Sequence, residues 1–390
     1  MLEQQTRDGA APGAAEDQTL LSMPRRVEKL NFTFTNRCNL RCSYCPQGTH
    51  PESYHQEVSE DFMESLLFFA RGRQVGEIGI GYYGEMLQVR DWWKYCLRML
   101  EIGCKISCVT NFSRVLLPEE VEVFARFREI GISVDTHEAA TLREMRKAVD
   151  IRTITYNTQL IRAYCLRRGL PGPALIWTGV MTEAVVHQMP DFVAFAAANG
   201  IRQLHFNDVA QYHGLPAKVR NVIDLDGEDF FAAVRSIDAA INVAKACGVG
   251  LGIDGIPRFV DKYKKLVAGE TVTPQIASRH GIQGICEVKV FESDRLPPGH
   301  TRACVSPWTE FYLDPKGDVM ACCARGEVMG RVGPDGILDD ILQNEKYRAL
   351  RATLLTGEGL EEGCALCPIR PAIPVDQFRE RLKALMMSAR

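Results

Sequence analysis

Residues 30–45 read Leu-Asn-Phe-Thr-Phe-Thr-Asn-Arg-Cys-Asn-Leu-Arg-Cys-Ser-Tyr-Cys, and this stretch decides the fold. Its first half alternates apolar and polar side chains, which is typical of a β-strand with two different faces. Its second half places Cys38, Cys42 and Cys45 in a loop directly after that strand. Structural zinc sites use four ligands, and the nearby loop adds only His50 and His55 as candidates for a fourth. The stretch therefore predicts a metal centre with a position open to a small ligand.

The spacing C-x3-C-x2-C, with the aromatic Tyr44 before the last cysteine, resembles the signature of the radical S-adenosylmethionine (SAM) superfamily. The resemblance implies that Cys38, Cys42 and Cys45 hold a 4Fe-4S cluster whose open iron binds the amino and carboxyl groups of SAM. It also implies that SAM is cleaved to a 5′-deoxyadenosyl radical, which takes a hydrogen atom from substrate. The electron is expected from a flavodoxin-type or ferredoxin-type donor. A structural zinc loop is the alternative.

A second group of cysteines lies near the C-terminus and has the pattern C-x12-G-x4-C followed by C-x2-C. This pattern resembles the auxiliary-cluster module called SPASM, or twitch in its shorter form. No cysteine follows the C-x2-C pair, so the resemblance implies one auxiliary 4Fe-4S cluster. Its expected ligands are Cys304, Cys322, Cys364 and Cys367, with Cys323 as an alternative to Cys322. A four-cysteine zinc site is the other interpretation of this group.

Strand-like and helical segments alternate from residue 28 to about residue 210, which indicates parallel strands connected by crossover helices. The fold class implied by the resemblance is α/β, a partial (β/α)6 barrel like an incomplete TIM barrel, with a small C-terminal SPASM or twitch domain. In such a barrel the apolar face of each strand packs under the helices, so the polar face points inward and predicts a ligand cavity. The strands are expected at 29–35, 77–82, 105–110, 131–135, 174–181 and 202–208.

Composition and pattern divide the chain into five segments. We expect a disordered tail over 1–27, the barrel over 28–215, a helical bridge over 216–299, the cluster domain over 300–371 and a C-terminal helix over 372–390. A short strand at 249–253 is expected to lead into the bridge.

Several strand ends carry polar residues suited to SAM. Gly84-Glu85 partly matches the superfamily's Gly-Gly-Glu-Pro motif and is expected to receive the SAM ammonium group. Ser133 or Asp135 is expected to hold the ribose. An ordinary strand-end turn or cap is the alternative interpretation of these residues. The expected SAM-contacting residues are Tyr44, Gly84, Glu85, Asn111, Ser133, Asp135 and Thr178, with Thr182 as an alternative to Thr178.

Acid and base groups for the substrate are sought at the barrel mouth, and His137, His205 and His213 are the candidate catalytic residues. A histidine on an alternating strand is more often a core residue than a base. Further candidates for substrate contact or proton transfer are Tyr82, Asn207 and Asp208. Cys286 is a candidate hydrogen-atom donor or additional ligand.

The auxiliary-cysteine spacing is similar to that of twitch-domain dehydrogenases of amino-sugar and cyclitol antibiotic pathways. The leading hypothesis is therefore a radical SAM oxidoreductase that oxidises a sugar, a cyclitol or a related small molecule. A SPASM-type peptide or protein maturase, which forms crosslinks, epimers or formylglycine, is the alternative. An iron-sulfur electron carrier is a third class, disfavoured because a carrier has little need of a substrate-sized barrel.

Composition sets the remaining expectations. The net charge of −3 gives no basic field for nucleic acid, and no apolar run approaches the length of a membrane span. The N-terminus lacks the basic and apolar regions of a signal peptide, so a cytoplasmic protein is expected. Fourteen cysteines in a reducing compartment favour metal ligation over disulfides.

Overall fold

The computed structural model describes residues 18–81, 83–209, 219–254, 259, 262–263, 296–322, 326–332, 338–367 and 370–388. In this part of the chain, seven parallel strands form the centre and follow one another in chain order across the sheet. They are β1 (Lys29–Phe32), β2 (Glu77–Ile80), β3 (Lys105–Thr110), β4 (Glu129–Ser133), β5 (Ala174–Val180), β6 (Gln203–Asn207) and β7 (Gly250–Ile253).

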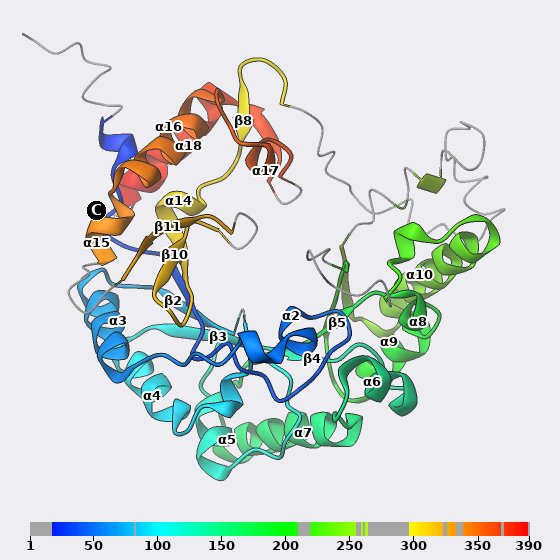
Figure 1. Ribbon diagram of the computed structural model, residues 1–390. Helices are drawn as coiled ribbons and strands as arrows, with labels where there is room; N and C mark the ends of the chain where they lie inside the picture. The colour runs from blue at the N-terminus through cyan, green and yellow to red at the C-terminus, as the bar shows by residue number, and fades with distance from the viewer. Residues whose placement is uncertain are drawn as a thin grey trace, which may run out of the picture.

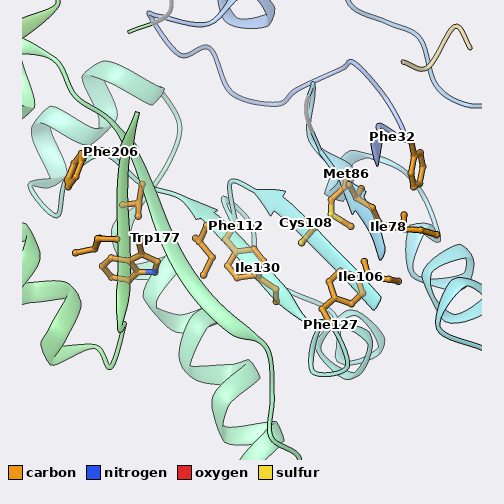
Figure 2. Close-up of a cluster of buried hydrophobic side chains, with 14 of the residues drawn as sticks. Phe32, Ile78, Met86, Ile106, Cys108, Phe112, Phe127, Ile130, Trp177 and Phe206 are labelled. Atoms are coloured by element: carbon orange, nitrogen blue, oxygen red, sulfur yellow. The ribbon is translucent and has the colours of Figure 1, made fainter. Parts of the chain in front are cut away.

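Helices cover the outer face of these strands (Figure 1). Alternate strand residues point to this face, as with Ile78, Ile106 and Ile130, which are buried on three successive strands (Figure 2). The fully buried Trp177 and Phe206 continue the layer. The covering helices are α3 (Glu60–Gly72), α4 (Trp92–Ile102), α5 (Pro118–Phe124), α6 (Ala139–Arg146), α7 (Ile151–Arg168), α8 (Glu183–Val186), α9 (Met189–Ala198) and α10 (Gly227–Cys247).

The expected α/β class, with a largely parallel sheet and a small C-terminal domain, is confirmed. Some strands differ from expectation. The strand expected in the bridge is β7, which pairs in parallel with β6 and adds a seventh strand. The first strand ends at Phe32 and the fourth at Ser133, three and two residues early. Residues 139–168 form two helices, because Lys147 and Ala148 have positive φ and Asp150 begins α7 by accepting a hydrogen bond from Arg152 N.

The C-terminal module extends the same sheet. Its strand β9 (Glu310–Leu313) pairs in parallel with β1, and β10 (Asp318–Met320) and β11 (Val328–Arg331) follow as antiparallel neighbours. A separate pair of strands, β8 (His300–Arg302) and β12 (Ala372–Pro374), lies beside the module's helices (Figure 1). These helices are α14 (Ser306–Thr309), α15 (Leu338–Leu342), α16 (Glu345–Thr356), α17 (Glu362–Ala365) and α18 (Val375–Ser388).

Residues 18–27 differ from the expected disordered tail, because they pack on the C-terminal module. Leu20, Met23 and Val27 are buried, and Trp308 Nε1 donates a hydrogen bond to Leu20 O at 2.6 Å. The apolar residues of this segment pack on the module, whereas the composition of residues 1–27 as a whole predicted disorder. In the described residues, the helices lack the combination of length and apolar character that crossing a membrane demands.

Candidate active site

The loop after β1 brings the three N-terminal cysteines together. Cys42 is buried, and Cys38 and Cys45 are half-buried. Burial raises the pKa of the Cys38 thiol to about 11 and that of the Cys42 thiol to about 12, and the negative charge of Cys45 adds to both rises. Metal binding needs thiolates, so a metal or cluster bound here would replace the thiol protons.

Three cysteines on one loop can hold a 4Fe-4S cluster that has one iron without a protein ligand. Four thiolates around one zinc ion, each about 2.3 Å from the metal, would lie within about 4 Å of one another. Among the described residues, no three Cys, His, Asp or Glu side chains are placed to hold one metal ion. In a 4Fe-4S cluster each cysteine binds a different iron, so the sulfur atoms surround the cluster without meeting at a point. Cys38, Cys42 and Cys45 therefore fit the expected cluster.

Asn111, which follows β3, lies against the cysteine loop. It is buried, its Nδ2 donates a hydrogen bond to Asn39 Oδ1 at 3.1 Å, and the same nitrogen is 3.8 Å from Cys38 Sγ. Hydrogen bonds to the sulfur ligands of a cluster are one of the factors that set its reduction potential. The predicted SAM-contacting residue thus also contacts a predicted cluster ligand.

The Gly84-Glu85 pair packs against the same loop from β2. Glu85 N donates a hydrogen bond to Arg37 O at 2.8 Å. Gly84 has φ +68°, and a side chain there would collide with the carbonyl oxygens of Thr35 and Arg37. Glycine is therefore required where the two loops meet.

The Glu85 carboxylate is buried and accepts three hydrogen bonds, two from the end of β3 and one from the turn that follows Glu85. It accepts from Thr110 Oγ1 at 2.7 Å, from Asn111 N at 2.7 Å and from Leu87 N at 3.1 Å. Burial raises its pKa, and the three donors oppose that rise. A carboxylate has about four acceptor positions, so about one remains for a ligand. Glu85 therefore combines a structural role with the predicted contact to SAM.

Tyr44 of the cysteine loop forms a network with Asp135 and Arg146, in which Asp135 and Arg146 are buried and Tyr44 is half-buried. Asp135 Oδ2 accepts hydrogen bonds from Tyr44 OH and from Arg146 Nε, both at 2.8 Å. Asp135 Oδ1 accepts from Arg146 Nη2 at 2.7 Å and from Val180 N at 2.9 Å. The acceptor positions of this carboxylate are filled within the chain. Ser133 is therefore the better ribose candidate at the end of β4.

A row of polar side chains crosses the inner face of the sheet. In the register of the strands, Ser133 lies opposite Thr178, Thr178 opposite His205, and His205 opposite Gly252. His205 Nε2 is 3.2 Å from Asp254 Oδ1, and both side chains are substantially exposed, at 41% and 50%. A Cβ on Gly252 would lie 2.5 Å from His205 Nδ1, so glycine makes room for the imidazole ring.

Four other predicted residues lie outside this row. His137 stacks on Phe195 and Phe192 of α9, with ring centroids 5.1 and 6.2 Å apart, and so joins the helix layer instead of the inner face. Thr182 is buried and begins α8. Asn207 is exposed at the end of β6, and Asp208 follows it and accepts a hydrogen bond from Val209 N. The residues that fall outside the described part of the chain are Tyr82, His213, Cys286 and Cys323.

The C-terminal cysteines lie in half-buried positions of the module, at Cys304, Cys322, Cys364 and Cys367. Burial raises the pKa of the Cys304 thiol to about 11, and the negative charge of Cys322 contributes to the rise. Arg302, fully buried on β8, donates hydrogen bonds to Ala365 O and to Arg370 O. This arginine anchors the Cys364–Cys367 turn beside the strand that leads to Cys304.

Sequence reasoning missed Arg146 and Asp254. No local pattern distinguishes Arg146 from the other arginine of α6, Arg143, because its partners come from two distant loops. Asp254 follows Gly250-Leu-Gly-Ile253, a segment too short and too rich in glycine to be assigned to the sheet by alternation. Because β7 belongs to the parallel sheet, Asp254 lies at the carboxyl end of a strand. Parallel sheets commonly bind their ligands at this edge.

Two family models match the chain. The Radical SAM superfamily model matches residues 32–170, and the SPASM model, described as an iron-sulfur cluster-binding domain, matches residues 304–368. Both matches agree with the expectations from the two cysteine groups. No curated protein matches the chain.

Several solved structures are similar in fold. Streptococcus suis SuiB is 16% identical with a TM-score of 0.55, covering 84% of this chain and 68% of its own. SuiB bound to precursor peptide SuiA is 14% identical with a TM-score of 0.57, covering 90% of this chain and 74% of its own. Native anSMEcpe with bound AdoMet and Cp18Cys peptide is 13% identical with a TM-score of 0.54, covering 93% of this chain and 100% of its own. At these identities the likeness concerns the fold.

Proposed function

Because the chain is a radical SAM superfamily enzyme with a C-terminal iron-sulfur cluster-binding domain, we propose that it oxidises a hydroxyl-bearing small molecule of the sugar or cyclitol class. The observation that carries the proposal is the polar row on the inner face of the sheet. It joins the hydroxyl groups of Ser133 and Thr178 to the His205–Asp254 pair at the carboxyl ends of four adjacent strands. Such a row suits a polyol, because each substrate hydroxyl needs a hydrogen-bonding partner.

The cysteine residues hold the cofactors in this proposal. Cys38, Cys42 and Cys45 hold the SAM-binding 4Fe-4S cluster, and the C-terminal set holds one auxiliary 4Fe-4S cluster through Cys304, Cys322, Cys364 and Cys367. When bound, SAM and its cluster supply a 5′-deoxyadenosyl radical, and the auxiliary cluster supplies an acceptor for one electron. Asn111 orients Cys38, and the Tyr44–Asp135–Arg146 network fixes the loop between Cys42 and Cys45.

SAM is held by the strand ends around the cysteine loop. The remaining acceptor position of Glu85 and the Gly84 backbone receive the SAM ammonium group. Ser133 and Thr178 face the ribose or the adjoining substrate hydroxyl. Asn111 closes the same side of the site. A flavodoxin-type or ferredoxin-type protein is the proposed electron donor.

Oxidation of a carbinol carbon removes a hydrogen atom, a proton and an electron from the substrate. His205 accepts the hydroxyl proton through Nδ1, because Nε2 faces Asp254 Oδ1 at 3.2 Å and the ring is exposed on the inner face. Asp254 orients the imidazole and stabilises its protonated form, as carboxylates do beside catalytic histidines. Of the three histidines expected from the sequence, His205 is the one whose described position supports this role. His137 faces α9 instead.

A peptide substrate is the alternative. SuiB has been solved with precursor peptide SuiA and anSMEcpe with the Cp18Cys peptide, and both share the fold. Shared fold alone does not select a substrate. The polar row favours the small molecule, because a peptide maturase has no general need for several hydroxyl partners at the reacting carbon.

Anaerobically reconstituted enzyme tests the proposal with a panel of sugars, cyclitols and nucleosides deuterated at carbinol carbons. We expect one panel member to stimulate SAM cleavage and to transfer one deuterium to 5′-deoxyadenosine, with a ketone or aldehyde as product. A peptide library is the comparison arm. Stimulation by a peptide and by no panel member would replace the dehydrogenase proposal with the maturase alternative.

A further inference from the structure

Tyr347 carries a buried hydroxyl group that the chain itself does not satisfy. The side chain is fully buried in the first turn of α16, and its oxygen has no hydrogen-bond partner among the described residues. A buried hydroxyl without a partner costs about 1–3 kcal/mol, so such a group calls for an explanation. A bound group that accepts a hydrogen bond would provide one.

The ring of Tyr347 is held rigidly. Its backbone N–H donates to Asn344 Oδ1 at 3.0 Å, and Asn344 Nδ2 donates to Met329 O of β11 at 2.8 Å. Arg351 lies over the ring, 5.2 Å from its centroid, and donates to Pro307 O of α14 at 2.8 and 3.1 Å. These contacts fix Tyr347 between the helix that follows Cys304 and the hairpin that carries Cys322.

The first turn of α16 lies beside the end of β10 that leads to Cys322, because Asn344 is hydrogen-bonded to Met329 of β11 and the adjacent Val328 pairs with Met320 of β10. Burial raises the pKa of Tyr347 above its ordinary value, and the negative charge of Cys322 adds to the rise. The positive charge of Arg351 opposes the rise. Burial lowers the pKa of Arg351 to about 10, so its guanidinium stays positive at neutral pH.

We propose that the Tyr347 hydroxyl donates a hydrogen bond to a sulfur atom of the auxiliary cluster, at or beside Cys322 Sγ, and raises the reduction potential of that cluster. Reduction adds negative charge, which a hydrogen-bond donor stabilises, with the Arg351 cation behind the ring acting in the same direction. The inference rests on the auxiliary cluster and is independent of the substrate. Tyr347 is a positioning residue, since it acts on the cofactor's electronic properties and does not touch substrate.

The test measures the midpoint potential of the auxiliary cluster by redox titration followed by electron paramagnetic resonance. Full-length protein with Cys38, Cys42 and Cys45 changed to Ala carries only that cluster. In this background Tyr347→Phe should lower the midpoint potential by about 59 mV. This shift corresponds to a tenfold decrease in the equilibrium constant of one-electron reduction. Tyr263→Phe is the matched control, since Tyr263 is also buried but packs against Phe231 of α10, and should leave the potential unchanged.

A second variant covers the case in which Tyr347→Phe fails to hold the cluster. Replacing Tyr347 by 3-fluorotyrosine keeps the ring and makes the hydroxyl a stronger donor, so the potential should rise. An unchanged potential in either cluster-containing variant would overturn the proposal. Loss of the cluster in both variants would also overturn it, because Tyr347 would then serve assembly and not tuning. Failure of the substrate panel would leave these measurements unaffected, so the two proposals can fail separately.

Discussion

Arg146 donates two parallel hydrogen bonds to the carboxylate of Asp135, from Nε to Oδ2 at 2.8 Å and from Nη2 to Oδ1 at 2.7 Å. Both side chains are buried. Arginine is suited to this two-point contact by its planar guanidinium. The pair stands between α6 and the end of β4, and Tyr44 adds the cysteine loop to it. The cysteine loop is thus fastened by a charge pair, not by apolar packing alone.

Removing the arginine should destabilise the protein and loosen this loop. Arg146→Gln leaves the Asp135 carboxylate buried without its partner, which should cost about 3–5 kcal/mol in the free energy of unfolding. Chemical denaturation measures that loss. Arg143→Gln, in the same helix but exposed, should cost less than about 1 kcal/mol. Equal small losses in both variants would show that the buried pair contributes no more than a surface one.

The two cysteine groups should load independently. Reconstituted native protein should hold about eight iron atoms, and the variant with Cys38, Cys42 and Cys45 changed to Ala about four. The triple variant should no longer cleave SAM, because the site that binds SAM is lost. Iron and zinc analysis checks the count. Native protein that saturates near four iron atoms with zinc in addition would contradict an auxiliary iron-sulfur cluster.

Glu85→Gln should weaken SAM binding by about 1–3 kcal/mol while the iron content stays intact. The amide loses the charge that pairs with the SAM ammonium group, and its NH₂ opposes one of the donors that Glu85 now accepts from. Calorimetry with the reconstituted protein measures the affinity. Glu119→Gln, exposed on α5, is the control. Unchanged affinity in Glu85→Gln would mean that another group receives the ammonium.

The His205–Asp254 pair should separate SAM cleavage from product formation. With the substrate identified by the panel, His205→Gln should still form 5′-deoxyadenosine but little oxidised product, because the hydroxyl proton has no acceptor. Asp254→Asn should lower the rate constant of product formation more than it changes KM. Asp208→Asn, at the neighbouring strand end, is the comparison.

Gly252→Ala offers a steric check on the same pair. Its new Cβ meets the His205 ring, so the variant should impair product formation in the same way as His205→Gln, without removing either titratable group. Product formation at the native rate in Gly252→Ala would show that the position of the His205 ring is unimportant.

Much of the fold could be predicted because its signals are local. The alternation before Cys38 and the cysteine spacings specified β1, the loop and the C-terminal module. Pairings between distant segments could not be predicted in this way. In the sequence, Arg146 does not differ from the other helical arginines, and its role follows only from the position of Asp135 after β4. The role of Asp254 likewise follows only from the pairing of β7 with β6.

The same limit affected individual side chains. Alternation predicts the direction of a side chain only while the strand lasts, and β4 ends at Ser133. His137, four residues later, therefore turns to α9. Glu85 was predicted from its motif, yet its three internal hydrogen bonds depend on the neighbouring strand and have no local signature.

The pairing of β9 with β1 also has a consequence for biosynthesis. β1 is translated before its second neighbour, which lies about 280 residues later, where Asn31 Nδ2 meets Phe311 O. Until the ribosome has delivered that segment, β1 is an unprotected edge with open backbone donors and acceptors. Late, long-range closure of this kind slows folding and exposes nascent chains to aggregation. A chain shortened to its N-terminal domain would keep that edge permanently.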